Sequence, residues 1–140
     1  MLELTKELLE DEPKKMAETL LSSGSKTTST QMRKFYDDFL LLKKKMQGLG
    51  DVQFTRDILP LVRFAKAKMA YNVGRQSLPA SFKKEMDGYI DKIETKNDFE
   101  HFILFYQALI AYTKYGESQK SQPRFDSSSN RMKPMDPRRR

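Results

Sequence analysis

The sequence has no cysteine, a single histidine and no long apolar run. Without cysteine, disulfide bonds, thiolate metal sites and cysteine nucleophiles are excluded. No apolar run approaches the roughly 18 to 20 residues that a membrane-spanning helix needs, so we expect no membrane partner. The loops GxxxxGKS/T and GxGxxG, which hold nucleotide phosphates, are absent as well. The sequence therefore argues against a function based on cysteine chemistry, on membrane insertion or on the common nucleotide-binding loops.

The first residues, MLELTKELLEDEP, are acidic and lack the basic-then-apolar order of a secretory signal peptide. We therefore expect a cytoplasmic protein. The 140 residues fit one domain, and nine Phe and six Tyr supply enough apolar area for a modest core.

Apolar residues recur at helical spacing, and no segment alternates with the period of a strand. The sequence predicts an all-α fold, a compact bundle of about five helices that forms a domain over residues 1–116. Residues 117–140 are rich in serine, proline and charge, so we expect a disordered basic tail there. The expected helices cover residues 13–21, 28–46, 51–74, 79–93 and 98–115.

Two helix starts resemble capping boxes, in which two side chains three residues apart satisfy free backbone N–H groups. Thr28 and Gln31 have this spacing, with Ser29 as a rival first residue. Asn97 and Glu100 have it before the last helix. We therefore expect helices to begin at Thr28 or Ser29 and directly after Asn97.

The helix over residues 51–74 is expected to organise the rest of the chain. Pro60 lies inside its pattern, so we expect a kink or two short helices that meet at Leu59. Gly74 is placed to end the helix in the left-handed conformation. The apolar stripe consists of Ile58, Val62, Ala65, Met69 and Val73. One flank of the stripe holds Phe64, Lys68, Tyr71 and Arg75, and the other holds Arg56, Arg63 and Lys66.

Positive charge is concentrated in the middle of the chain. The formal net charge is +7, and residues 26–75 hold eleven Lys or Arg against four acidic residues. A local excess of this kind indicates a polyanionic partner, and the alternative is a solvated basic face. The closing RRR either adds electrostatic affinity or is a solvated tail.

Candidate catalytic and metal-binding residues are few. His101, in a helix rich in aromatic residues, is more typical of a packed or surface side chain than of a catalyst. Asp87, Asp91 and Glu94 share a helix face, either as oxygen ligands for a divalent metal or as an acidic stripe that faces solvent or a partner. We expect no enzyme activity, no bound metal and no cofactor. A small hydrolase that depends on His101 is the least favoured class.

The basic side chains form the candidate site. Those near the start of the second helix gain from the helix dipole, which favours phosphate at a helix N-terminus. Tyr36, Phe64 and Tyr71 either stack on bases or sugars or pack at the rim of the core. A helix-turn-helix regulator that binds DNA, with Gly48 or Gly50 in the turn, is the alternative. The candidate nucleic-acid-binding residues are Arg33, Lys34, Arg63, Lys66, Lys68, Tyr71 and Arg75.

Three blocks of sequence, taken in order, resemble the small subunit of type III-A CRISPR interference complexes, the Csm effector. They read TTSTQMRKFYDDF, LVRFAKAKMAYNVGR and FILFYQALIAYTKYG, and span about residues 27–116. Gln107 stands where the third block has an acidic residue in that family. Lys34 and Arg63 do not match the family's blocks, and only the charge pattern makes them candidate binding residues. The residues that match the family's blocks are Arg33, Lys66, Lys68, Tyr71 and Arg75.

The resemblance implies an all-α, non-catalytic small subunit of an antiviral complex. Its partners would be the guide RNA and the target RNA, other copies of itself, and the backbone and large polymerase-like subunits of the Csm complex. Its basic faces would run along the paired RNAs through sequence-independent contacts with the backbone. Acidic segments outside residues 26–75 would meet neighbouring copies, aligned head to tail.

Overall fold

The structure, a computed structural model, describes residues 2–22 and 29–126. Within these residues it consists of helices and turns, with no strand, which confirms the predicted all-α bundle. Two short π turns, η1 and η2, run directly into the helices that follow them. The elements are η1 (Glu7–Asp11), α1 (Glu12–Ser22), α2 (Ser29–Lys45), α3 (Asp51–Gln53), η2 (Phe54–Ile58), α4 (Leu59–Gly74), α5 (Ala80–Asp91) and α6 (Lys96–Asp126).

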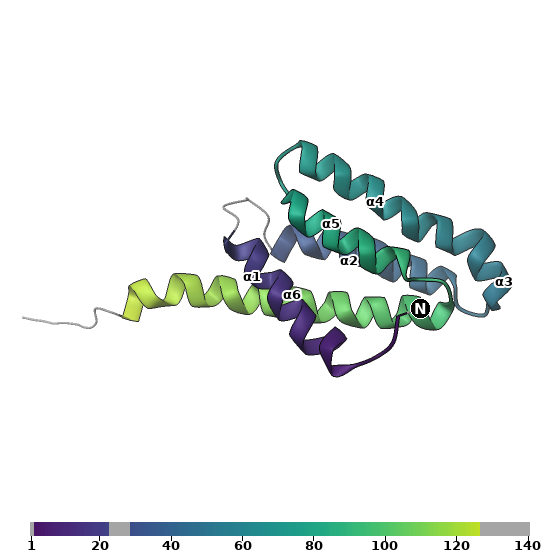
Figure 1. Ribbon diagram of the computed structural model, residues 1–140, viewed down its shortest axis with the longest axis horizontal. Coiled ribbons are helices and arrows are strands. Elements are labelled where there is room, and N and C mark those ends of the chain that lie inside the picture. The colour runs from purple at the N-terminus through teal and green to yellow at the C-terminus, as the bar shows by residue number, and fades with distance from the viewer. Residues whose placement is uncertain (1, 23–28, 127–140) are drawn as a thin grey trace, which may run out of the picture.

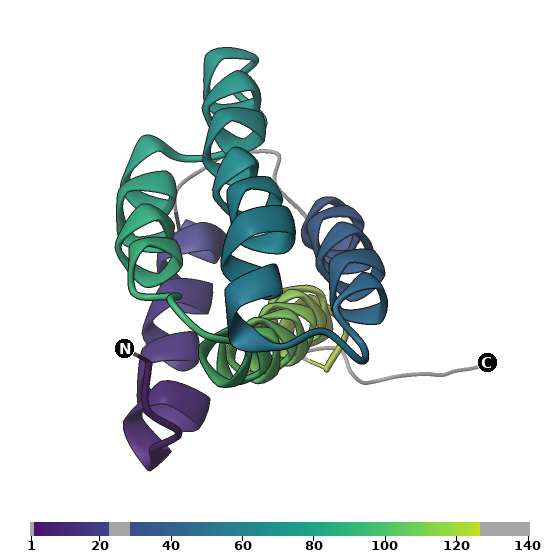
Figure 2. The same cartoon turned by 90° about the vertical axis from the view of Figure 1, so that its right-hand side faces the viewer.

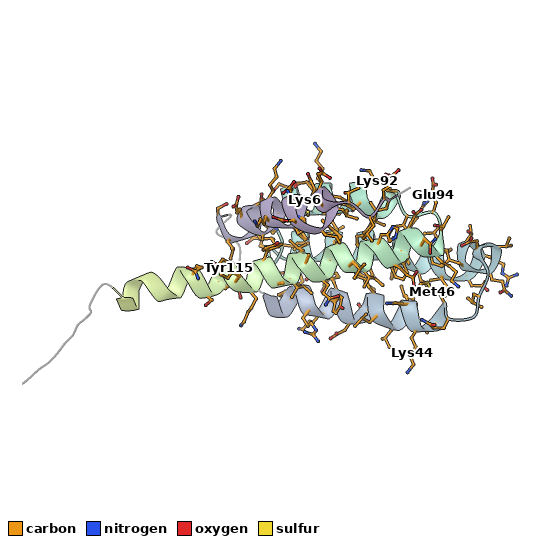
Figure 3. The ribbon with its side chains drawn as sticks, turned by 90° about the horizontal axis from the view of Figure 1, so that it is seen from below. Lys6, Lys44, Met46, Lys92, Glu94 and Tyr115 are labelled. Atoms are coloured by element: carbon orange, nitrogen blue, oxygen red, sulfur yellow. The ribbon has the colours of Figure 1, made fainter. Side chains whose placement is uncertain are left out.

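α6 is the longest element and runs along the whole length of the bundle (Figure 1). The view from below shows α6 between α1 and α2, which both pack on it (Figure 3). α4 and α5 pack against each other, and the end-on view shows α4 between α5 and α2 (Figure 2). One flank of α4 therefore faces α5 and the other faces α2.

The core is built on the aromatic face of α6. The ring of Phe39, from α2, meets the ring of Phe102 edge-on, with 5.1 Å between the ring centroids. The hydroxyl of Tyr106 donates to the carbonyl oxygen of Met32 at 3.0 Å, and burial raises the pKa of Tyr106 well above its ordinary value. The α6 side chains without exposed surface include Phe99, Phe102, Phe105, Tyr106 and Leu109.

Pro13 and Pro60 each follow a π turn. Glu12, the residue before Pro13, donates its backbone N–H to the carbonyl five residues earlier, and so does Leu59 before Pro60. The wider turn makes room for a proline ring that would clash with the preceding turn of a regular α-helix. The disruption predicted at Leu59 is therefore present as a π turn inside continuous helical backbone. The first helix likewise begins before Pro13 and not at it.

The N-terminus of α6 is capped by Thr95 and Asp98, so the predicted cap at Asn97 and Glu100 is wrong. The Thr95 hydroxyl accepts the backbone N–H of Asp98 at 3.2 Å, and the Asp98 carboxylate accepts the N–H of Thr95 at 3.2 Å. This pair is a capping box that begins two residues earlier than expected. Asp98 also accepts the N–H of Leu2 at 3.0 Å. The cap therefore ties the N-terminal segment to α6.

α4 ends at Gly74, but the left-handed residue is Gln76, with φ of 63°. The N–H of Gln76 bonds to the carbonyl of Val73 and the N–H of Ser77 to that of Asn72, both at 2.9 Å. These two bonds define a Schellman motif in which Gln76 takes the place usual for glycine. The prediction of a left-handed Gly74 is therefore wrong, since the chain turns two residues later.

Gln76→Gly is expected to stabilise the fold by up to about 1 kcal/mol, because glycine takes the left-handed conformation without strain. Gly74→Ala is expected to stabilise it by a similar amount, about 0.5–1 kcal/mol, because alanine is the better helix former. A Cβ added at Gly74 meets no atom within 4 Å. Urea unfolding measures both changes, and a loss of stability in Gln76→Gly would contradict the role given to this turn.

The C-terminal helix α6 continues to Asp126, past the predicted helix end near Tyr115. Residues 117–126, which were expected to belong to the tail, are thus helical. The predicted cap residue Thr28 and the remainder of the predicted tail lie outside the described residues. The division into a domain over residues 1–116 and a tail over residues 117–140 stays a prediction.

Candidate nucleic-acid interface

An open groove of about 650 Å³ lies between α2 and α4, and we call it the α2/α4 groove. On the α4 side it is lined by the flank that the sequence distinguishes by its i, i+4, i+7 and i+11 spacing. The structure therefore brings together four of the seven predicted binding residues. The groove is lined by Lys34, Phe35 and Asp38 of α2 and by Phe64, Lys68, Tyr71 and Arg75 of α4 and its C-terminus.

Two aromatic rings in the α2/α4 groove each lie beside a cation one helical turn further along. Nζ of Lys68 is 5.8 Å from the ring centroid of Phe64, and Cζ of Arg75 is 5.5 Å from that of Tyr71. Both rings are open to solvent, with exposed fractions of 57% for Phe64 and 65% for Tyr71. Cation–π attraction holds each cation beside its ring. The same aromatic–cation unit is therefore repeated seven residues apart on one helix face.

The charged side chains of the α2/α4 groove leave a positive excess, with three cations against one carboxylate. Nζ of Lys68 is 3.4 Å from Oδ2 of Asp38, and both side chains are about half exposed. An exposed pair of this kind contributes little stability, so an incoming phosphate can displace it. Within the described parts of the chain, no carboxylate pairs with Lys34 or Arg75.

Arg63 and Lys66 lie on the opposite flank of α4, which faces α5. Nη2 of Arg63 donates to the carbonyl oxygen of Ile93 at 3.2 Å, and Lys66 forms an ion pair with Asp91. These contacts tie α4 to α5 and to the turn that follows it. The members of the predicted binding set that lie on α4 are therefore divided between two sides of this helix.

Arg33 lies on a third surface. Its Nε is 3.4 Å from Oδ1 of Asp37, and its Cζ is 5.6 Å from the ring centroid of Tyr36. Tyr36 stacks on Tyr106 of α6 and donates its hydroxyl hydrogen to Oε1 of Gln107 at 3.4 Å. Tyr36 therefore belongs to the contact between α2 and α6, at the rim of the core. Gln107, where the resemblance implied an acid, acts there as a neutral acceptor.

Phe64 and Asp38 line the groove although neither was in the predicted binding set. The signal for Phe64 is its position four residues before Lys68, which repeats the spacing of Tyr71 and Arg75. For Asp38 the sequence holds no such signal, because only the packing of α2 beside α4 brings its carboxylate to Lys68.

Two of the three acidic residues considered as metal ligands, Asp87 and Asp91, are paired with lysines. Asp87 pairs with Lys83, one turn earlier on α5, and Asp91 pairs with Lys66 of α4. Among residues 2–22 and 29–126, no group of three acidic or histidine side chains is arranged to hold a metal ion. Structural ion pairs are therefore the role that the contacts assign to Asp87 and Asp91.

His101 packs against the N-terminal segment. Its Nδ1 lies 2.7 Å from the carbonyl oxygen of Leu2, so an N–H on this nitrogen donates to that oxygen. Asp98 accepts the N–H of the same residue. The two side chains together hold both backbone groups of Leu2 on α6, a structural role that agrees with the packing interpretation of His101.

A second groove, of about 710 Å³, lies between α1 and α6, and we call it the α1/α6 groove. Tyr112 and Tyr115 contribute to its lining, together with one lysine and one glutamate, Lys14 and Glu18. One lysine against one glutamate leaves this second groove without a net positive charge. The α2/α4 groove is therefore the better candidate for a polyanion, and Tyr115, labelled in Figure 3, marks a surface apart from it.

The fold and the groove define a class, a small all-α protein with a basic, aromatic-lined surface groove. No helix in the part of the chain that the structure describes has the length and apolarity to cross a membrane. The family model described as Csm2 Type III-A matches residues 3–119. The chain therefore belongs to the Csm2 family and is a small subunit of the type III-A CRISPR effector complex. No curated protein and no solved structure matches the chain.

The family match confirms the resemblance carried by the three sequence blocks. It also extends toward the N-terminus, because it starts at residue 3, whereas the blocks span only about residues 27–116. Every candidate binding residue, from Arg33 to Arg75, lies inside the matched region.

Proposed function

We propose that this chain is a non-catalytic cytoplasmic subunit that lines the path of the guide RNA and target RNA duplex in the Csm complex. The α2/α4 groove contacts the RNA backbone through Lys34, Lys68 and Arg75. The observation that supports this role is the grouping of these three cations in one open groove of a Csm2-family chain. Contacts of this kind read phosphate and shape and leave the sequence to base pairing.

Arg33, Arg63 and Lys66 are proposed as outer contacts that contribute less than the groove. Each already has a partner, namely Asp37, the carbonyl of Ile93 and Asp91. All three lie outside the α2/α4 groove, so RNA held in the groove would meet them only at its edges. Substitution of Arg33 by alanine is therefore expected to weaken RNA binding in the same direction as substitution in the groove, but by less.

Contacts with other copies and with the backbone and large subunits are proposed on the acidic surface outside residues 26–75. Asp87 and Asp91 are already paired inside this chain. The more accessible acids are at the N-terminal end, where Glu3 and Glu7 are exposed and line a depression between η1 and α5. Recovery of these subunits with the tagged protein tests this part of the proposal.

Lys68→Ala and Arg75→Ala are each expected to weaken RNA binding several-fold, about equally for RNAs of different sequence. Each should also lower the slope of log affinity against log salt concentration by about 1, because one phosphate contact is lost. Fluorescence anisotropy with short guide–target duplexes at several salt concentrations measures both quantities.

Arg56→Ala is the matched control for these two variants. It also removes one positive charge, but Arg56 pairs with its neighbour Asp57 at 2.8 Å and lies outside the groove. Its RNA affinity is expected to stay within about twofold of the wild type. An equal loss in Arg56→Ala, or a loss in Arg75→Ala that depends on RNA sequence, would contradict the groove as the contact surface.

A further inference from the structure

We propose that the α2/α4 groove takes unpaired nucleotides of RNA, whose bases stack on Phe64 and Tyr71. This inference rests on the proposed RNA contact at the same groove. The phosphates of the duplex meet the cations of the groove, and nucleotides that are left unpaired along the duplex path gain the additional stacking contacts. The starting observation is the presence of two exposed aromatic rings in the groove, because binding of phosphate does not by itself require such rings.

The two rings are placed as open stacking platforms. Phe64, Tyr71 and Tyr115 are the exposed aromatic side chains among residues 2–22 and 31–119. Seven residues separate Phe64 from Tyr71 on α4, which corresponds to two helical turns and about 10 Å along the helix axis. Both line the same groove, so a single strand that follows the groove passes both rings.

A continuous duplex cannot use these platforms. In paired RNA each base face is covered by its neighbours, so a protein meets mainly phosphates and sugars. Unpaired bases can be splayed out and stacked on aromatic rings, and such stacking does not depend on base identity. The two residues are about 10 Å apart along the helix axis, well beyond the roughly 3.4 Å between stacked bases, so their rings would receive two bases of a splayed strand.

The charges around the rings suit such a strand. Lys68 and Arg75 each lie beside a ring, at 5.8 and 5.5 Å from the centroids, so each platform has a cation for the adjoining phosphate. Asp38 lies in the same groove, where its carboxylate would repel a phosphate. Carboxylates accept hydrogen bonds from base amino groups, and in an RNA duplex the amino groups of adenine and cytosine lie in a deep, narrow major groove that side chains cannot reach.

The test compares two labelled probes with the full-length protein. One is an RNA single strand without self-complementarity, and the other is the same strand annealed to its complement. Phe64→Leu and Tyr71→Leu keep an apolar side chain but remove the ring. Each is expected to weaken single-strand binding about tenfold and duplex binding by less than about twofold. Tyr115→Leu, which removes a ring of 64% exposure from the α1/α6 groove, is expected to change neither.

The outcomes separate this inference from the proposed function. Equal losses on both probes, or no loss on either, would overturn stacking on Phe64 and Tyr71 while leaving the phosphate contacts in place. The proposed function fails independently if Lys68→Ala and Arg75→Ala leave the binding of both probes unchanged. If the wild-type protein binds neither probe, both proposals are overturned. Thermal unfolding of each variant verifies that the fold is intact, as expected for exposed side chains.

Discussion

Phe102→Ala is expected to lower the free energy of unfolding by about 3–5 kcal/mol, because it leaves a cavity at the centre of the bundle. Phe102 is fully buried. Its ring centroid lies 5.1 Å from that of Phe39 and 6.1 Å from those of Phe105 and Tyr106. Removing the ring therefore takes apolar contacts from α2 and α6 at once. Urea unfolding followed by far-UV circular dichroism measures the change.

Leu104→Ala is the matched control on the same helix. Leu104 is 44% exposed, so its truncation leaves no closed cavity, and a loss below about 1 kcal/mol is expected. If Phe102→Ala and Leu104→Ala were equally destabilising, α6 would not be the core helix of the bundle.

Asp98→Ala is expected to cost about 3 kcal/mol, the second-largest effect, because three backbone N–H groups, one buried and two partly buried, lose a charged acceptor. These groups belong to Leu2 and Glu94, both at 3.0 Å, and to Thr95 at 3.2 Å. The Asp98 side chain is only 4% exposed, so water cannot readily replace it. Asn97→Ala, at the cap position that the sequence wrongly favoured, is the control and is expected to change stability by less than about 0.5 kcal/mol.

The same carboxylate gives the fold a defined dependence on pH. Burial by itself would raise the pKa of Asp98, but the backbone N–H donors of Leu2, Glu94 and Thr95 hold it below its ordinary value of 3.8. The stabilisation by Asp98 is therefore complete above about pH 5 and is lost as the pH falls through the ordinary pKa and then through the lowered pKa of the folded state. The stability difference between the wild type and Asp98→Asn should accordingly shrink below pH 4. A difference that grows on acidification would contradict this assignment.

The helical core could be predicted from the sequence because apolar spacing alone determines which face is buried. Val62, Ala65 and Met69 of α4 lie on the predicted stripe and are buried. The ends of helices were harder to predict than their buried faces. At the N-terminus of α6, for example, two possible capping boxes lie within a few residues of each other. Thr95–Asp98 prevails over Asn97–Glu100, and the bond from Asp98 to Leu2, almost a hundred residues away in sequence, is invisible to local patterns.

The sequence predicted which residues of α4 lie together in the candidate site, but not which residues of other helices join them. The flank that carries Lys68 and Arg75 follows from spacing within one helix. The addition of Lys34 depends on how α2 packs beside α4, which neither helix encodes by itself. Arg33 could have been separated from Lys34 at the start, because consecutive residues on a helix do not share a face.

The role of this chain in an RNA-guided complex is tested most directly by a native pull-down of the tagged protein from its own host, with identification of the RNA and proteins that co-purify. The predicted result is a set of small RNAs that share a repeat-derived end, together with the other Csm subunits. Recovery of promoter DNA, or of neither nucleic acid nor partners, would contradict the account. A helix-turn-helix regulator would then be the better interpretation of the basic helices.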